Sequence, residues 1–252
     1  MESVIPLFKT HYSIGRSILT LEKSGDSRPN GPDSIIDIAV KDKLDSVFIV
    51  DDGMGGFLQA SLNLQEEGVP FHFGVRLTVC EDMNQKGEES LSTESKMVIM
   101  CKTFTGYERL IKIYSLAAKD GFYYRPRIDY KNLESLWHDD LMLMIPFYDS
   151  FIYNNITSYS ICIPKFNFTD PVFAIESNGL PFDFLIKEKV MEYVSDKYKT
   201  VNTQSIFYKD KKDFKSYLTF RCINNRSTLN KPNLDHMCSD TFCYEHWNES
   251  KD

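Results

Sequence analysis

Basic side chains are the minority among the charged residues of this sequence. It contains 29 lysines and arginines against 36 aspartates and glutamates, which gives a formal net charge of −7 at pH 7. Affinity for duplex nucleic acid comes mainly from lysine and arginine side chains that neutralise phosphates. We therefore expect no direct, tight binding to nucleic acid.

Long hydrophobic runs are also missing. No window approaches the roughly 18 consecutive apolar residues that a membrane span needs. The first residues, MESVIPLFKTHY, show no basic stretch followed by an apolar run. These absences predict a soluble protein that is not exported and makes no membrane contact. We expect it in the cytoplasm, or in the host cytoplasm if its source is a virus.

Cysteine is sparse and scattered, and we find no internal repeat or low-complexity segment. A chain of 252 residues can bury a large core without disulfides, so the cysteines are predicted to be free thiols. The length also predicts one domain over residues 1–252. The six cysteines are Cys80, Cys101, Cys162, Cys222, Cys238 and Cys243.

Helical and strand-like segments alternate along the chain. Asp33 is predicted to cap a helix that runs to Leu44. The further segments expected are strands at 46–50, 69–79, 97–101, 141–145 and 172–175, and helices from 57 to near 68, at 107–118 and at 184–194. Strands separated by helices of this length favour parallel pairing. The sequence thus predicts the α/β class, closed as a β/α barrel, with loops at 25–32, 84–95 and 148–168.

Two segments resemble a known family most specifically: GYERLIKIY at 106–114 and GFYYRPRID at 121–129. THYS at 10–13 and VDDG at 50–53 precede them in the family's order. The later segments are FGVR at 73–76, AIESNGLP at 174–181, VNTQSIFY at 201–208, RCINNRSTL at 221–229 and SDTF at 239–242. Together they resemble the PHP domain of bacterial-type DNA polymerase III alpha subunits, from about Pro6 to Trp247.

The resemblance implies a fold and the place of a site. The family fold is a distorted barrel of seven β/α units, with its site at the carboxyl ends of the strands. Residues 225–252 would then be an exit segment or tail of the domain.

Active PHP domains hold a cluster of divalent metals with histidines and carboxylates, which act on phosphoester bonds. Very few of those ligands are present here, so the resemblance implies no catalytic residue, no metal ligand and no cofactor. The positions that match the family's ligands, here vestigial, are Leu7, Lys9, Asp51, Asp52, Arg76, Asn178, Ser205 and Phe207.

Positive charge has replaced ligands at two of these positions, Lys9 and Arg76. A guanidinium or ammonium repels a metal ion. We predict an ion pair of Lys9 or Arg76 with Asp51 or Asp52, which holds the former site closed without a metal.

Two other motifs contain residue types that occur in binding sites. DDGMGG at 51–56 lacks the lysine and the spacing of a P-loop, so turn geometry explains its glycines. Nitrogen and sulfur ligands near the carboxyl end offer a conceivable tetrahedral zinc site, although their spacing fits no common zinc finger. They are His236, Cys238, Cys243 and His246.

The expected function is a non-catalytic replication module. In the family this domain braces the polymerase and docks the proofreading exonuclease, so the expected partner is a polymerase subunit or that exonuclease. The chain would be a piece of a split polymerase or a decoy for such partners, as expected of a phage or mobile element. The alternatives are a metal-dependent phosphoesterase or 3′–5′ exonuclease with new ligands, and a domain excised from a longer chain.

Overall fold

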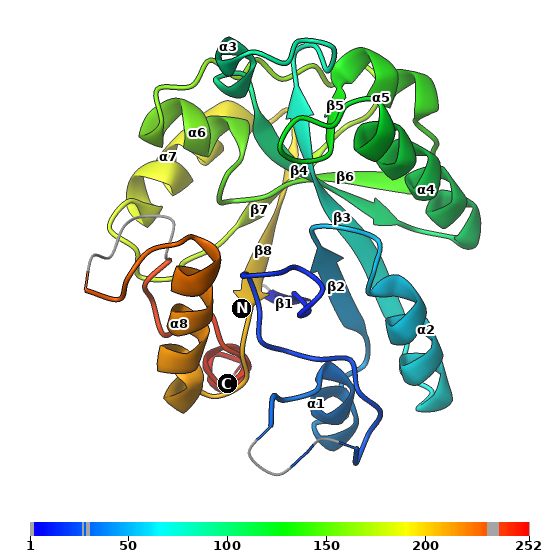
Figure 1. The fold of residues 1–252 in the computed structure, drawn as a ribbon, viewed down its shortest axis with the longest axis vertical. Coiled ribbons are helices and arrows are strands. Elements are labelled where there is room, and N and C mark those ends of the chain that lie inside the picture. Colours follow the sequence, from blue (N-terminus) through cyan, green and yellow to red (C-terminus); the bar gives the residue numbers. More distant parts are fainter. Residues whose placement is uncertain (1–2, 27, 29–30, 231–236, 252) are drawn as a thin grey trace. The chain divides into compact units, whose positions relative to one another are not determined.

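The structure is a computed structural model that describes residues 3–26, 28, 31–230 and 237–251. The chain falls into two compact units (Figure 1). The first unit comprises Met1–Phe73, Glu176–Asp183 and Asn202–Asp252, and the second comprises Gly74–Ile175 and Phe184–Val201. The single domain over residues 1–252 remains a prediction.

The first unit is built around parallel strands. Its elements are β1 (Ile5–Phe8), α1 (Ile35–Lys41), β2 (Val47–Asp51), α2 (Phe57–Glu66), the carboxyl-terminal part of β8 (Lys199–Ile206), the 3-10 helix η1 (Lys211–Asp213), α8 (Phe214–Asn224) and α9 (Tyr244–Glu249). β1 pairs in parallel with both β2 and β8. The carboxyl ends of the three strands therefore lie at one edge, and the segments that follow them meet there.

The register explains which side chains reach that edge. Phe8 lies opposite Ile49 in β2 and opposite Ile206 in β8, and all three are fully buried. They form a layer of core beneath the strand ends. Lys9 and Asp52, one to three residues further on, lie just past this layer.

The second unit combines strands of both directions with helices. Its elements are most of β3 (Phe71–Cys80), α3 (Glu88–Leu91), β4 (Ser95–Cys101), α4 (Phe104–Lys119), β5 (Arg127–Asp129), α5 (Tyr130–Leu136), β6 (Leu141–Ile145), α6 (Phe151–Thr157), β7 (Val172–Ile175) and nearly all of α7 (Asp183–Val194). The mixed α/β class predicted from the alternation of segments is confirmed.

The prediction of parallel pairing is wrong for β4. This strand is antiparallel to β3, with Val75 opposite Ile99, and antiparallel to β6, with Ile99 also opposite Leu143. A parallel partner would need a crossover that carries the chain back along the ten residues of β3. In the connection at residues 81–94 the one helix is α3, which has four residues and advances about 6 Å. The chain therefore turns back directly.

Local capping also corrects the sequence prediction. Ser34, not Asp33, caps α1, because the Ser34 hydroxyl accepts from the Ile36 amide at 3.1 Å. The predicted loops at 84–95 and 148–168 contain α3 and α6. Ser150 caps α6, because its hydroxyl accepts from the Tyr153 amide at 3.3 Å. Of the predicted loop at 25–32, residues 27, 29 and 30 lie outside the described part.

The two motif segments at 106–114 and 121–129 form one packed element. A Cβ at Gly106 would collide with the carbonyl oxygen of Asp140, and one at Gly121 with that of Arg127. Only glycine allows the backbone to approach so closely at these positions. The two glycines thus allow both ends of α4 to pack closely against neighbouring backbone.

A buried ion pair holds the connection between α4 and β5. The Arg127 guanidinium, fully buried, donates to Glu94 Oε1 at 3.0 Å and to the Gln85 carbonyl at 2.9 Å. Arg125 donates to the other oxygen of Glu94 at 2.9 Å. The Glu94 carboxylate, directly before β4, therefore binds Arg125 just before β5 and Arg127 at the start of β5.

The predicted exit segment at 225–252 includes a docked helix, α9. The Trp247 indole donates to the Val4 carbonyl at 2.9 Å, and the Tyr244 ring stacks on Phe8 with centroids 6.0 Å apart. The carboxyl-terminal helix thus packs on the strand that begins the first unit. Within the described ranges, every helix is too short or too polar to cross a membrane.

Candidate functional site

Two vestigial positions of the first unit, Lys9 and Asp52, meet where β1 and β2 end. The Lys9 ammonium lies 3.0 Å from Asp52 Oδ1, and the Lys9 side chain is only 7% exposed. The predicted ion pair is therefore present between these two residues. A cation already neutralises the carboxylate that faces this edge.

Asp51 is fully engaged by the loop that follows β1. Its Oδ1 accepts from the Thr10 amide at 2.9 Å and from the Ser13 hydroxyl at 2.7 Å. Its Oδ2 accepts from the Thr10 hydroxyl at 2.7 Å. The carboxylate serves as the hydrogen-bond centre of this loop.

The glycines after Asp52 have a steric role. A Cβ at Gly56 would lie 2.8 Å from Asp51 Oδ2 and 3.1 Å from Tyr12 Cδ2. Only glycine, which has no side chain, therefore fits at this position, and α2 can begin against the Asp51 carboxylate. Gly56 has a φ of −80°, so close packing against Asp51 and Tyr12, rather than an unusual turn conformation, explains this glycine of DDGMGG.

A second polar cluster surrounds Asn178 and Ser205. Glu176 Oε2 accepts from the Asn178 amide nitrogen at 3.0 Å and from the Ser205 backbone amide at 3.1 Å. Glu176 Oε1 lies 2.8 Å from the Ser205 hydroxyl. Gln204 donates to Asn178 Oδ1 at 2.6 Å, and the Thr241 hydroxyl donates to the same atom at 3.1 Å. The amide oxygen of Asn178 thus already has two donors.

Burial dominates the electrostatics of Glu176. It raises the pKa of this carboxyl above its ordinary value, while the hydrogen bonds from Ser205 and Asn178 act in the opposite direction. Oε1 contacts the hydroxyl groups of Thr203 and Ser205, which can accept a hydrogen bond as well as donate one. The geometry therefore accommodates the neutral acid, with its proton on Oε1.

The other vestigial positions are structural. Phe207 is buried and stacks on Phe242 and Tyr217, with centroids 5.2 Å and 5.7 Å away. Leu7 lies within β1, opposite Ser205. Arg76 lies in β3 of the second unit, where its guanidinium pairs with Asp149.

The cysteine and histidine positions near the carboxyl end have local roles where they are described. The Cys243 sulfur caps α9 by accepting from the His246 amide at 3.5 Å, and its thiol lies 3.2 Å from the Asp240 carbonyl. Burial raises the pKa of Cys243 to about 11, which disfavours the thiolate that zinc requires. Cys238 is exposed. His236 lies outside the described residues, so the zinc site stays a prediction.

Acidic side chains gather at one further place. In the described ranges, the one group of three potential metal-binding side chains is Asp33, Asp210 and Asp213. Lys209 lies 3.5 Å from Asp33, and Lys212 lies 3.1 Å from Asp210. Lysine ammonium groups therefore already compensate this acidic cluster.

Sequence reasoning missed the groups that engage the vestigial positions. Glu176 follows β7 directly, and a carboxylate at the end of a strand was the available signal. Thr10 and Ser13 gave no such signal, because hydroxyl residues in a loop are ordinary turn formers.

Comparison with known proteins identifies the family. The model of the PHP domain family matches residues 24–157, more than half of the chain. The chain therefore belongs to the PHP domain family, and the prediction of the PHP-type distorted β/α barrel is confirmed. The chain is also similar to the DNA polymerase III subunit alpha of Aquifex aeolicus (strain VF5), at 26% identity over 145 residues. That match covers 54% of this chain and 12% of the relative.

Proposed function

We propose that this chain is a non-catalytic PHP module that acts in DNA replication through contacts with other proteins. One observation carries the proposal. The Lys9 ammonium is bonded to Asp52 at 3.0 Å, in a partly buried place where the resemblance implies metal ligands. A fixed cation that satisfies the carboxylate leaves a metal ion no electrostatic advantage there.

The remaining vestigial groups do not fit a divalent metal cluster. Such ions need several oxygen or nitrogen ligands with open lone pairs. Asp51 accepts three hydrogen bonds from Thr10 and Ser13, and Asn178 Oδ1 accepts from two donors. Metal binding would have to displace these contacts, so we derive no catalytic step through a metal.

The similarity to a DNA polymerase III subunit alpha motivates the choice of partner. We infer that the module binds a polymerase subunit or a proofreading exonuclease in the cytoplasm. It would do so as one piece of a split polymerase or as a decoy that competes for these proteins. A phage-encoded copy fits the decoy role.

Elemental analysis of protein purified without chelator tests the non-catalytic part. We expect substoichiometric manganese, iron and zinc, and no hydrolysis of bis-p-nitrophenyl phosphate when manganese or zinc is added. Stoichiometric metal together with hydrolysis that Asp51→Asn abolishes would instead support the alternative, a phosphoesterase or 3′–5′ exonuclease that uses Asp51.

A pull-down from the native cell, scored only for polymerase and exonuclease subunits, tests the partner. We expect one such subunit to be enriched and then to bind the purified chain at 1:1 stoichiometry. If neither subunit binds when both are supplied in purified form, the replication role is wrong.

A further inference from the structure

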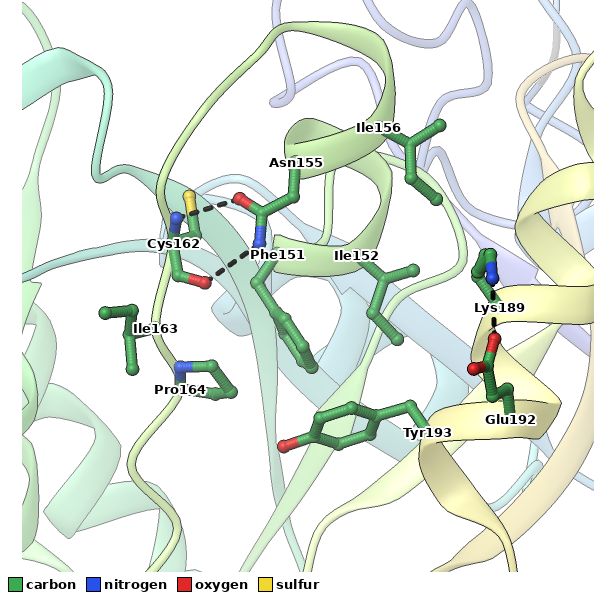
Figure 2. Close-up of a pocket in the computed structure, with 10 residues that line it drawn as sticks. All are labelled: Phe151, Ile152, Asn155, Ile156, Cys162, Ile163, Pro164, Lys189, Glu192 and Tyr193. Carbon is green, nitrogen blue, oxygen red and sulfur yellow. Dashed lines mark hydrogen bonds and ion pairs between the residues drawn. The ribbon is translucent and has the colours of Figure 1, made fainter.

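The second unit contains a pocket of about 540 Å³ that the proposed site does not include. Figure 2 shows it between α6, the segment 162–164 and the carboxyl-terminal half of α7. Phe151 and Ile152 of α6, Pro164 and the Tyr193 ring surround the hollow. A volume of this size is within the usual range for binding pockets.

The walls of the pocket are fixed before any ligand arrives. Asn155 accepts from the Cys162 amide at 2.8 Å and donates to the Cys162 carbonyl at 3.0 Å, so one side chain ties the segment 162–164 to α6 (Figure 2). The Cys162 thiol also lies 3.1 Å from the Glu94 carbonyl. On the opposite side, the Phe151 and Tyr193 rings pack edge to face with centroids 5.0 Å apart. A preformed pocket loses little entropy when it is filled.

The charged side chains that line the pocket are paired with each other, which favours an uncharged ligand group. Lys189 and Glu192 are the charged side chains among the lining residues, and they pair with each other at 2.6 Å. The amide of Asn155 is used by Cys162. An anionic group such as a phosphate or carboxylate would therefore find no uncompensated cation, whereas an apolar group finds complementary walls.

Apolar side chains that line the pocket are also exposed. Ile163 is 63% exposed and Tyr193 is 39% exposed. Ile161 and Met191, each two residues away in sequence from one of them, are 70% and 49% exposed. A small ligand would leave this surrounding surface in water, whereas a protein segment would cover it.

We propose that this pocket receives an apolar anchor side chain, aromatic or branched aliphatic, from an uncharged stretch of a protein partner. The inference rests on the proposed function in one respect, namely that the chain works by binding another protein. It adds the surface and the chemistry of the partner segment. The anchor enters between Ile152 and Tyr193, and its flanks cover Ile163.

Methyl NMR with a defined probe tests the pocket without the partner. The isoleucine methyl groups of the full chain are labelled with ¹³C, and N-acetyl-tryptophanamide or N-acetyl-leucinamide is titrated as the neutral anchor. We expect saturable shifts at Ile152, Ile156 and Ile163. N-acetyl-tryptophan, which carries a carboxylate, should bind at least fivefold more weakly. No saturable shift with either neutral probe, or equal binding of the charged one, overturns the proposal.

Two exposed isoleucines, Ile161 and Ile163, supply matched variants. Ile163→Glu puts a charge on a lining residue, whereas Ile161→Glu puts the same charge two residues away, outside the lining. We expect at least tenfold weaker probe binding for Ile163→Glu and less than a twofold change for Ile161→Glu. An equal loss in both variants indicates a diffuse apolar surface and overturns the proposal.

The partner assay separates this inference from the proposed function. If the probes bind as expected and no polymerase or exonuclease subunit binds, the pocket proposal is supported and the proposed replication role is contradicted. If a subunit binds with equal affinity to the native chain and to Ile163→Glu, the proposed replication role is supported and the pocket proposal is contradicted.

Discussion

At the scale of single residues, two buried ionisable groups of the first unit depend on very different surroundings. Lys9 is stabilised by a partner of opposite charge, Asp52. Glu176 is surrounded by neutral donors, and the neighbouring charge that acts on it, Asp183, is of the same sign. The first group should therefore stabilise the fold as an ion, and the second as a neutral acid.

Lys9→Met should lower the free energy of unfolding by about 1–2 kcal/mol, because it removes the buried ammonium that pairs with the partly buried Asp52 carboxylate. Urea unfolding of the purified chain measures the change. The double variant Lys9→Met, Asp52→Asn removes both charges and should recover part of the loss. If the single variant is as stable as the native chain, the ion pair does not hold this edge together.

Glu176→Gln should change how stability depends on pH. The pKa of Glu176 is raised in the folded chain, so its contribution is complete below the ordinary glutamate pKa and is lost as the pH rises through the folded value. We expect the native chain to lose more unfolding free energy than Glu176→Gln between pH 5 and pH 8. Parallel slopes in urea titrations across this range would contradict the prediction.

At the scale of elements, the connection from α4 to β5 depends on one carboxylate shared by two arginines. The side chain of Arg127 is fully buried, whereas that of Arg125 is 49% exposed. Both contact Glu94, but only Arg127 also donates to several backbone carbonyls. The two arginines therefore differ in burial while they share a partner.

Arg127→Met should destabilise the chain by about 3–5 kcal/mol, because it leaves the buried Glu94 and several carbonyl oxygens without their donor. Arg125→Met, the matched exposed change, should cost about 1 kcal/mol or less. Thermal and urea unfolding of the two variants give the comparison. Similar losses for both would show that burial does not set the strength of this contact.

At the scale of the whole molecule, the chain joins segments that are distant in sequence. The first unit is assembled from three separate stretches, so β1 pairs with β8 almost two hundred residues later. α9 then docks on the beginning of the chain through Trp247 and Val4. Residues near the carboxyl end are thus part of the first unit's core.

Trp247→Ala should destabilise the first unit by about 3–5 kcal/mol, because a buried indole is removed and the Val4 carbonyl loses its donor. Lys251→Ala, which removes an exposed cation over the same ring and leaves the indole in place, is the control and should cost less than about 1 kcal/mol. Hydrogen exchange at the β1 amides measures the effect. Unchanged protection in Trp247→Ala would mean that the segment is a loosely attached tail.

Much of the fold was determined by local patterns that can be read in the sequence. Apolar runs at 141–145 and 172–175 match β6 and β7 residue for residue. The motif segments at 106–114 and 121–129 indicated the family, which the comparison confirmed. The cationic side chains at Lys9 and Arg76 were also visible in the sequence, and because a cation repels a metal ion they predict that these positions hold none.

Only the tertiary structure decided strand direction and partner choice. The antiparallel placement of β4 depends on the path of a connection whose single short helix gave no signal in the sequence. The pairing of Lys9 with Asp52, and of Arg76 with Asp149, depends on which strand ends meet. Glu176 became part of the site because β8 brings Ser205 against it. Such contacts join residues far apart in sequence, and local periodicity carries no information about them.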